Sequence, residues 1–247
     1  MESISVGSPE AVEILTRVKA AAAGPVVAAE VGVGIGASTV QFVRILGPSD
    51  ELHLFDRTEP VTELISDLEE LPEAEGITFV NHSNEPKLYG SYAWELAVWL
   101  RELRSAKQST KVFDFVYLDG AHQFLHDAAA VSVLKQMIKP GGYIVFDDMT
   151  WTFNGSPTLN PRIRPETGLN YTEDQLRLPH VALVVDVLMR TDRSFDEIRI
   201  DDSPRSIRAV FRRKVKAAVT PKSKSNSKSA PLWRRAASRA RRALRSG

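Results

Sequence analysis

The stretch Phe113-Asp-Phe-Val-Tyr-Leu-Asp119-Gly-Ala-His122 has the form of a buried strand that ends in a carboxylate and a histidine. After an apolar-periodic segment, Lys139-Pro-Gly-Gly-Tyr-Ile-Val-Phe-Asp147-Asp148 repeats the pattern of a strand that ends in carboxylates. Ligands bind outside the carboxyl ends of the strands in an open parallel sheet, so we expect these residues to converge on one cleft. Three carboxylates in one cleft repel each other unless a cation lies among them. The pattern therefore favours a site for a hard metal ion with His122 as an adjacent base.

The segments around these two strands alternate in type along the chain. Short apolar runs predict the strands Val26–Val31, Glu51–Phe55, Ile77–Val80, Phe113–Leu118 and Tyr143–Phe146. Segments with helical spacing of apolar residues lie between them, and a tight turn joins two further strands, Phe195–Ile200 and Ser206–Arg212. This alternation predicts an α/β fold: a doubly wound, mostly parallel, Rossmann-like sheet of seven strands with a C-terminal antiparallel hairpin.

The composition excludes several classes of protein. The sequence contains no cysteine, which rules out a disulfide framework, a thiolate zinc site and a cysteine nucleophile. No apolar run approaches the roughly 20 residues that span a bilayer, and residues 1–11 lack the pattern of a signal peptide. We therefore expect a cytoplasmic protein.

The charge is divided unevenly along the chain. Residues 212–247 carry 13 Lys and Arg residues and no Asp or Glu, which leaves 19 basic and 31 acidic residues before them. Residues 213–247 are predicted to be a basic, largely disordered tail with a short amphipathic helix over 231–245. Such a tail suits weak peripheral contact with an anionic membrane or is simply a solvated extension, and nucleic acid is the less favoured partner. The sequence leaves open whether the chain forms a homo-oligomer.

A glycine-rich turn, Glu30-Val-Gly32-Val-Gly34-Ile-Gly36, follows the first predicted strand. Glycines there let the backbone turn sharply and approach a ligand closely. A second acid, Asp56, ends the second strand 20 residues after Gly36 and suits a ribose diol, because a carboxylate can accept from both hydroxyls. The pattern favours a nucleoside-type cofactor. The alternative is a plain tight turn before a helix that Ser38 caps.

The segment from Glu30 to Gly36 resembles the first motif of class I S-adenosylmethionine-dependent methyltransferases, and Asp56 matches the acid of their second motif. The resemblance covers roughly residues 10–212, so we assign residues 1–212 to a methyltransferase domain. It implies S-adenosylmethionine as the cofactor, held by Glu30, Gly32, Gly34, Gly36, Ser38, Asp56, Ser83 and Asp119. For Ser83 the match to the family pattern is loose.

Within that superfamily, the combination of Asp119-Gly-Ala-His122 and Asp147-Asp148 resembles the magnesium-dependent, macrocin-type sugar O-methyltransferases. By this resemblance Asp119, Asp147 and Asp148 bind Mg²⁺ or another hard divalent cation, and His122 is the general base. Catechol-type enzymes are similar but usually have Asp-Asn where this chain has Asp147-Asp148. The implied function is methyl transfer to a hydroxyl of a small-molecule acceptor, a sugar or polyhydroxylated natural product. The chemistry agrees, because a chelated cation lowers the otherwise high pKa of such a hydroxyl.

Plainer interpretations exist for the site residues taken singly. Asp119 before a glycine suits an ordinary turn, and Asp147 or Asp148 could cap a helix. His126 competes with His122 as the base, and Asp127 reads as a solvated helix residue. Two rival functions follow: a metal-independent small-molecule methyltransferase, and a non-catalytic nucleoside-binding module that acts through its basic tail.

One long segment breaks the alternation of strands and helices. Residues 149–179, which we call the lid segment, are rich in Pro, Asn, Thr and Arg and leave the strand that ends in Asp147-Asp148. Loops of this length without clear structure are usually substrate lids or disordered. Within it, Trp151 is the aromatic residue that we expect to contact substrate.

Overall fold

The computed structural model describes residues 7–85, 87, 90–199 and 207–215 of the 247-residue chain. By its contacts the chain divides into residues 1–215 and residues 216–247. The predicted tail helix and the turn between the last two strands lie outside the described residues. None of the helices in the described part has the length and hydrophobicity that crossing a bilayer requires.

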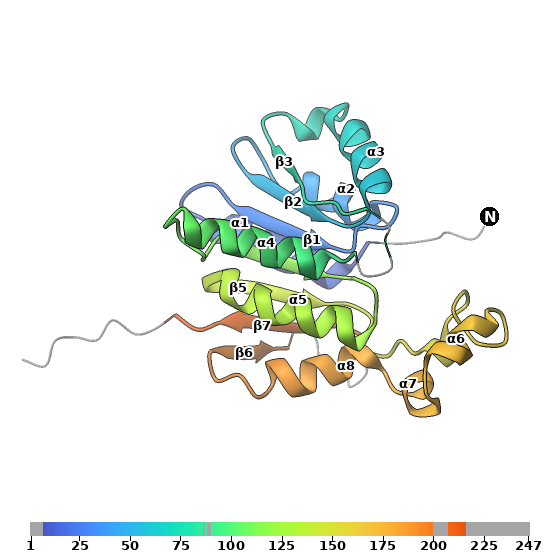
Figure 1. Cartoon of the computed structure of the whole chain (residues 1–247). Helices are drawn as coiled ribbons and strands as arrows, with labels where there is room; N and C mark the ends of the chain where they lie inside the picture. Colours follow the sequence, from blue (N-terminus) through green and yellow to red (C-terminus); the bar gives the residue numbers. More distant parts are fainter. Residues whose placement is uncertain (1–6, 86, 88–89, 200–206, 216–247) are drawn as a thin grey trace, which may run out of the picture. The chain divides into compact units, whose positions relative to one another are not determined.

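Within the described residues, seven strands form one sheet in the order β3-β2-β1-β4-β5-β7-β6 (Figure 1). The strands are β1 (Val27–Val31), β2 (Glu51–Phe55), β3 (Thr78–Asn81), β4 (Phe113–Leu118), β5 (Ile138–Phe146), β6 (Phe195–Ile198) and β7 (Ala209–Arg213). The first five are parallel, and β7 lies antiparallel between β5 and β6. This confirms the predicted mostly parallel sheet with its antiparallel pair at the C-terminal edge.

Helices cover both faces of the sheet, as a doubly wound fold requires (Figure 1). On one face lie α1 (Pro9–Ala21), α2 (Ala37–Val43) and α3 (Thr58–Glu69), which a 3₁₀ turn, η1 (Pro72–Ala74), follows. On the other lie α4 (Tyr92–Ser105), α5 (Phe124–Met137) and α8 (His180–Val184), which continues into a π-helical turn, η3 (Val185–Met189). Helix α1 was not among the predicted helices, although Ser8 caps it and Pro9 occupies its first turn.

The core is two apolar layers separated by the sheet. Successive residues of a strand point to opposite faces, so in β4 Val116 and Leu118 pack under α4 and α5, whereas Phe115 and Tyr117 pack under α1 and α2. All four side chains are buried. Burial of an aliphatic or aromatic side chain contributes about 1.5–3 kcal/mol, so this packing holds the end of β4 in a fixed place.

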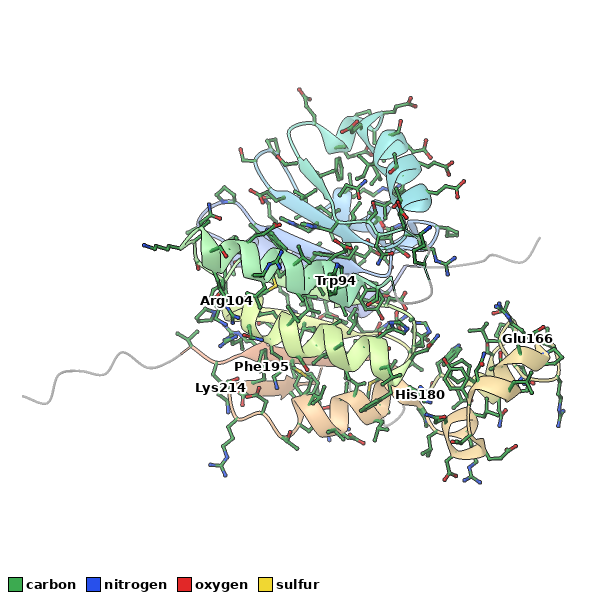
Figure 2. All side chains as sticks on the ribbon, in the orientation of Figure 1. Trp94, Arg104, Glu166, His180, Phe195 and Lys214 are labelled. Atoms are coloured by element: carbon green, nitrogen blue, oxygen red, sulfur yellow. The ribbon has the colours of Figure 1, made fainter. Side chains whose placement is uncertain are left out.

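The lid segment contains short helical pieces rather than the structureless loop that its composition suggests. They are η2 (Phe153–Gly155), α6 (Pro165–Asn170) and α7 (Glu173–Arg177). A capping box in which Thr172 and Gln175 exchange hydrogen bonds begins α7. Figure 2 labels His180 where this segment meets α8, and that junction fixes the end of the lid.

Candidate active site

A cavity of about 540 Å³ opens at the carboxyl ends of the central strands. Its walls include Gly32, Gly34, Asp56 and Asp119, four of the eight residues predicted to bind the cofactor. The other four, Glu30, Gly36, Ser38 and Ser83, are not among its lining residues. Asn84 lines the cavity in place of the neighbouring Ser83.

The three glycines of the turn have different tasks. All three have left-handed backbone, with φ of 86° at Gly32, 56° at Gly34 and 78° at Gly36. A Cβ at Gly32 would lie 2.0 Å from the carbonyl oxygen of Asp119, and one at Gly36 would lie 2.5 Å from Leu64. A Cβ at Gly34 would meet nothing within 4 Å. Gly32 and Gly36 therefore permit close packing of the protein, whereas Gly34 leaves open space on the cavity side.

Ser38 does not cap the helix that follows the turn, in contrast to the alternative interpretation of the sequence. Gly36, not Ser38, is the N-cap residue of α2, and it offers no side-chain cap. Ser38 is buried, and its Oγ accepts from the backbone N–H of Ser8 at 3.4 Å. Ser38 thus joins the turn to the start of α1.

Glu30 lies beneath the turn and is 1% exposed. The Thr39 hydroxyl donates to its Oε2 at 2.6 Å. Burial raises the pKa of Glu30 well above its ordinary value, and the nearby charges of Asp119 and Asp56 raise it further. Through Thr39, Glu30 joins the end of β1 to the first turn of α2.

Asp56 closes the turn from the end of β2. Its Oδ2 accepts from the backbone N–H groups of Val33 at 2.8 Å and Gly34 at 3.0 Å, and its Oδ1 accepts from Arg57 N–H at 2.7 Å. A carboxylate offers about four acceptor positions, so Asp56 can hold the turn and still face a diol in the cavity.

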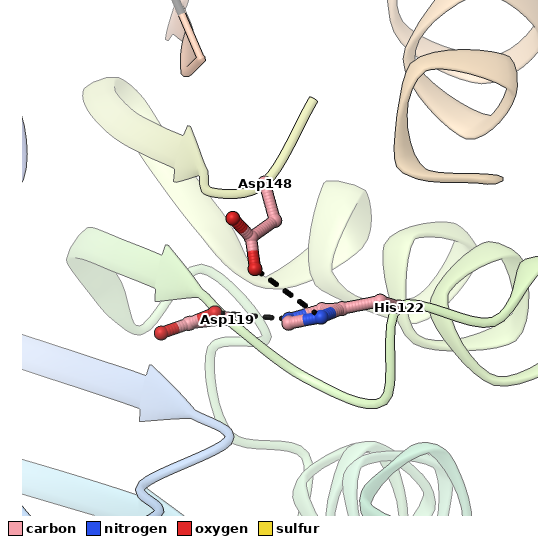
Figure 3. Close-up of side chains that lie close together, drawn as sticks. All are labelled: Asp119, His122 and Asp148. Atoms are coloured by element: carbon pink, nitrogen blue, oxygen red, sulfur yellow. Dashed lines mark hydrogen bonds and ion pairs between the residues drawn. The ribbon is translucent and has the colours of Figure 1, made fainter. Parts of the chain in front are cut away.

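Asp119, His122 and Asp148 form a compact group beside the cavity (Figure 3). His122 Nε2 is 3.0 Å from Asp119 Oδ1, and His122 Nδ1 is 3.3 Å from Asp148 Oδ2. One ligand atom from each residue lies within 4.8 Å of the others, a spacing that could hold a metal ion. The predicted convergence of the β4 and β5 ends is thus present for these three residues.

The backbone of this group is unusual. His122 has φ of 53° and Asp148 has φ of 52°, a left-handed conformation that is rare for residues other than glycine. Burial lowers the pKa of His122, but the hydrogen bond that its Nε2 donates to Asp119 and the charges of Asp119 and Asp148 outweigh burial and raise this pKa above its ordinary value. Burial also raises the pKa of Asp148, against the opposing effect of His122. The two carboxylates therefore favour the protonated form of the imidazole.

Asp147, the remaining predicted metal ligand, lies outside this group. Its carboxylate accepts from the Tyr117 hydroxyl, from Arg208 Nε at 3.1 Å and from the backbone N–H of Asp148 at 2.7 Å. The side chain is buried, whereas the Asp119 and Asp148 side chains are 35% and 37% exposed. Its role as a ligand stays a prediction, and its contacts point inward.

The other histidine and acid near His122 also differ in environment. His126 lines the cavity but is not part of the three-residue group. Asp127 is 1% exposed, so the expectation of a solvated side chain was wrong. Tyr92, which sequence reasoning missed, donates its hydroxyl to Asp127 Oδ1 and accepts from Ala121 N–H at 3.0 Å. The Tyr92–Asp127 pair holds the turn between Asp119 and His122 in place. The only hint of this in the sequence was the position of Tyr92 directly after Ser91, which caps α4.

The lid segment is attached to the site at both ends. At its start, the Trp151 ring meets the His122 ring edge to face, with centroids 5.3 Å apart. At its end, the Tyr171 hydroxyl donates to Gln123 Oε1 at 2.6 Å. Just beyond, His180 Nδ1 accepts from the backbone N–H of Phe124 at 3.1 Å, while its Nε2 donates to the Gln175 carbonyl at 2.7 Å. The lid segment therefore contacts His122 and Gln123, and His180 just beyond it contacts Phe124.

Comparison with known proteins places this architecture in context. Residues 29–149 match the family model of a methyltransferase domain. A search of curated proteins found no match. Similar crystal structures include a protein from Corynebacterium glutamicum, at 13% identity over 87% of this chain and 85% of that one, with a TM-score of 0.53. An O-methyltransferase from Bacillus cereus in complex with SAH is 15% identical over 85% and 83% of the two chains, with a TM-score of 0.52.

A third similar structure is the O-methyltransferase TomG from Streptomyces achromogenes, which is involved in tomaymycin synthesis and was solved with SAM. It is 15% identical over 87% of this chain and 84% of that one, with a TM-score of 0.50. At these identities the likeness shows a shared fold. That fold is the α/β, Rossmann-like arrangement described above.

Proposed function

We propose that this protein is an S-adenosylmethionine-dependent O-methyltransferase that uses a hard divalent cation. The match of residues 29–149 to the family model of a methyltransferase domain supports this proposal. The proposed acceptor is a hydroxyl of a sugar or polyhydroxylated natural product. One observation carries the proposal. Asp119 lines the cavity, its carbonyl oxygen closes on Gly32, and its carboxylate contacts His122. Asp119 therefore links the glycine turn, where the cofactor would bind, to His122, where the acceptor hydroxyl would react.

The cavity fits a nucleoside-type cofactor. Its volume lies in the range of about 300–1,000 Å³ that is usual for small-molecule sites. Gly34 leaves open space at the turn, and the acid Asp56 ends β2 beside it. Bound there, S-adenosylmethionine supplies an electrophilic methyl group.

The donor set fits a hard cation. Asp119 and Asp148 offer carboxylate oxygens from two neighbouring strand ends, and oxygen ligands suit Mg²⁺, Mn²⁺ or Ca²⁺ better than zinc. Such a cation supplies Lewis acidity, which lowers the pKa of a bound hydroxyl. Asp119 and Asp148 are the residues that would hold it.

The protein's own groups account for the proton. His122 has left-handed backbone, contacts the carboxylate of the cavity-lining Asp119 and meets the Trp151 ring edge to face. A neutral imidazole at this place can accept the hydroxyl proton, and the carboxylates of Asp119 and Asp148 stabilise the imidazolium that results. Trp151 contacts Phe153 edge to face, and Phe153 contacts Tyr171, so an aromatic cluster lies on this side of His122.

A labelled-methyl transfer screen against glycosides and phenols, with and without Mg²⁺, tests the proposal. We expect transfer to a hydroxyl acceptor that requires the cation and stops on treatment with EDTA. Full activity after EDTA would favour the metal-independent alternative. Calorimetry with S-adenosylhomocysteine tests the cofactor separately, and no binding at millimolar ligand would rule out the methyltransferase proposal as a whole.

A further inference from the structure

We propose that the two adjacent aspartates at the end of β5 have divided roles. Asp148 faces the cation, and Asp147 is an anchor that Arg208 holds in place. Arg208, which directly precedes β7, is then a positioning residue for the cation site. This inference rests on the proposed cation-dependent function and adds a residue to its machinery.

The contacts of Asp147 support the role of an anchor. Its oxygens accept from three donors that belong to the protein: the Tyr117 hydroxyl, Arg208 Nε and the backbone N–H of Asp148. With its side chain 8% exposed, the carboxylate is satisfied by these groups away from solvent. A buried carboxylate with a cationic partner and hydrogen bonds is stable where it is, and leaving this arrangement for a metal would break its ion pair with Arg208.

Arg208 is itself fixed from two sides. Its Nη1 contacts Glu10 Oε2 at 2.7 Å, while its Nε contacts Asp147 at 3.1 Å. The side chains of Arg208 and Glu10 are only 14% and 19% exposed. One guanidinium therefore ties the carboxyl end of β5 to α1, with separate N–H groups directed at the two carboxylates.

The anchor determines where Asp148 points. Asp147 Oδ1 accepts from the N–H of Asp148 at 2.7 Å, and the next N–H, that of Met149, donates to the Ile207 carbonyl at 2.8 Å. Between these bonds Asp148 takes its left-handed backbone, with φ of 52°, and its carboxylate comes within 3.3 Å of His122. Without the anchor, the N–H of Asp148 would lose the side-chain acceptor that holds it in this conformation.

The opposite interpretation makes an opposite prediction. If Asp147 were a cation ligand in solution, Arg208 would compete with the metal for it, and removing the arginine would strengthen cation binding. Its loss also removes a positive charge near the site, which favours a cation by simple electrostatics. If Arg208 positions Asp148 through Asp147, its removal weakens cation binding in spite of that charge effect. The sign of the change therefore separates the two interpretations.

The experiment is a Mn²⁺ titration of the full chain by calorimetry, on the wild type and on Arg208→Met, Asp147→Asn and Asp148→Asn. We expect Arg208→Met to weaken Mn²⁺ binding by about 10–100-fold, the scale on which residues that orient metal ligands act. Asp148→Asn should weaken it more than Asp147→Asn does. Affinity for S-adenosylhomocysteine and the thermal unfolding midpoint are measured alongside, and an unchanged cofactor affinity shows that the loss is confined to the cation.

A matched pair on α1 keeps the test informative if Arg208→Met does not fold. Glu10→Gln loosens Arg208 without touching Asp147 and should weaken Mn²⁺ binding in the same direction, whereas Glu13→Gln, which contacts Arg17 instead, should not change it. Tighter or equal Mn²⁺ binding by Arg208→Met, or equal losses in Asp147→Asn and Asp148→Asn, overturns the anchor. A wild type that binds S-adenosylhomocysteine but no Mn²⁺ at millimolar concentration removes the cation from the proposed function, and the anchor with it.

Discussion

Nδ1 of His53 and Nε2 of His82 lie 2.8 Å apart, inside a stack of rings between the sheet and α4. His82 lies flat on Phe55 with centroids 4.3 Å apart, and His53 stacks on Trp99 at 4.8 Å. Burial lowers the pKa of His53 to about 4. Burial and the neighbouring His53 lower the pKa of His82 to about 3. Both rings are therefore neutral at pH 7, and one N–H is shared between them.

This pair predicts a loss of stability in mild acid. Both folded pKa values lie below the 6.5 of an ordinary histidine, so the unfolded chain binds more protons. The contribution of the two histidines to the free energy of unfolding is complete above about pH 6.5. It falls as the pH drops toward pH 4, by at most about 1.4 kcal/mol per pH unit for each histidine. Urea unfolding between pH 7.5 and 4.5 measures this slope. His82→Phe keeps a ring on Phe55 and should make the slope shallower, and an equally steep slope in that variant would contradict the assignment.

Two glycine substitutions should separate folding from cofactor binding. Gly34→Ala puts a methyl group into open space, so it should cost only the left-handed strain of about 1–2 kcal/mol while weakening S-adenosylhomocysteine binding. Gly32→Ala drives a Cβ onto the Asp119 carbonyl and should destabilise the whole fold by more than that. Thermal unfolding and calorimetry on both variants check the contrast. Equal stability losses would show that the strand ends can move apart.

The sequence was sufficient for the strands because each central strand is a short apolar run with a sharp boundary. Glu51–Phe55 and Phe113–Leu118 have the predicted bounds. The start of β5 was predicted too late, at Tyr143, because Pro140, Gly141 and Gly142 resemble a turn. The strand begins at Ile138, which pairs with Phe113, and the register shift that follows accommodates the proline and glycines.

The site was harder to predict, since its geometry depends on residues that are distant in sequence. Nothing local links Arg208 to Asp147, which lies 61 residues earlier. Asp127 was misjudged because an acid on a helix is usually solvated, whereas here the Tyr92 hydroxyl lies 35 residues away and compensates for its burial. Strand ends follow from local patterns, but the partners of a buried charge follow only from tertiary packing.

His122→Ala should cut turnover by roughly 10²–10⁴-fold, the usual scale for a general base. Affinity for S-adenosylhomocysteine should not change, because the cavity walls at the glycine turn do not include His122. The matched control is His126→Ala, which removes the competing histidine one helical turn on. Steady-state kinetics on both variants decide between them, and unchanged turnover in His122→Ala would remove His122 from the mechanism.

Tyr92→Phe should destabilise the protein by about 1–3 kcal/mol, because it removes the hydroxyl that donates to Asp127. Within the described residues Asp127 Oδ2 has no hydrogen-bond partner, so the loss would leave the whole carboxylate without a donor side chain. A double-mutant cycle with Asp127→Asn measures the coupling by chemical denaturation. We expect the two changes to be far from additive, and simple additivity would mean that the hydroxyl and the carboxylate act independently.

The attachment of His180 to the first N–H of α5 has a practical consequence for loop grafting. A chimera that replaces both Tyr171 and His180 takes away the partner of Gln123 and the acceptor for the Phe124 N–H, so it would fray the helix that begins beside His122. A chimera that replaces only residues 154–170 leaves both attachments intact. Grafts that test whether the lid segment sets acceptor preference should therefore be confined to its outer half, with Tyr171 and His180 kept.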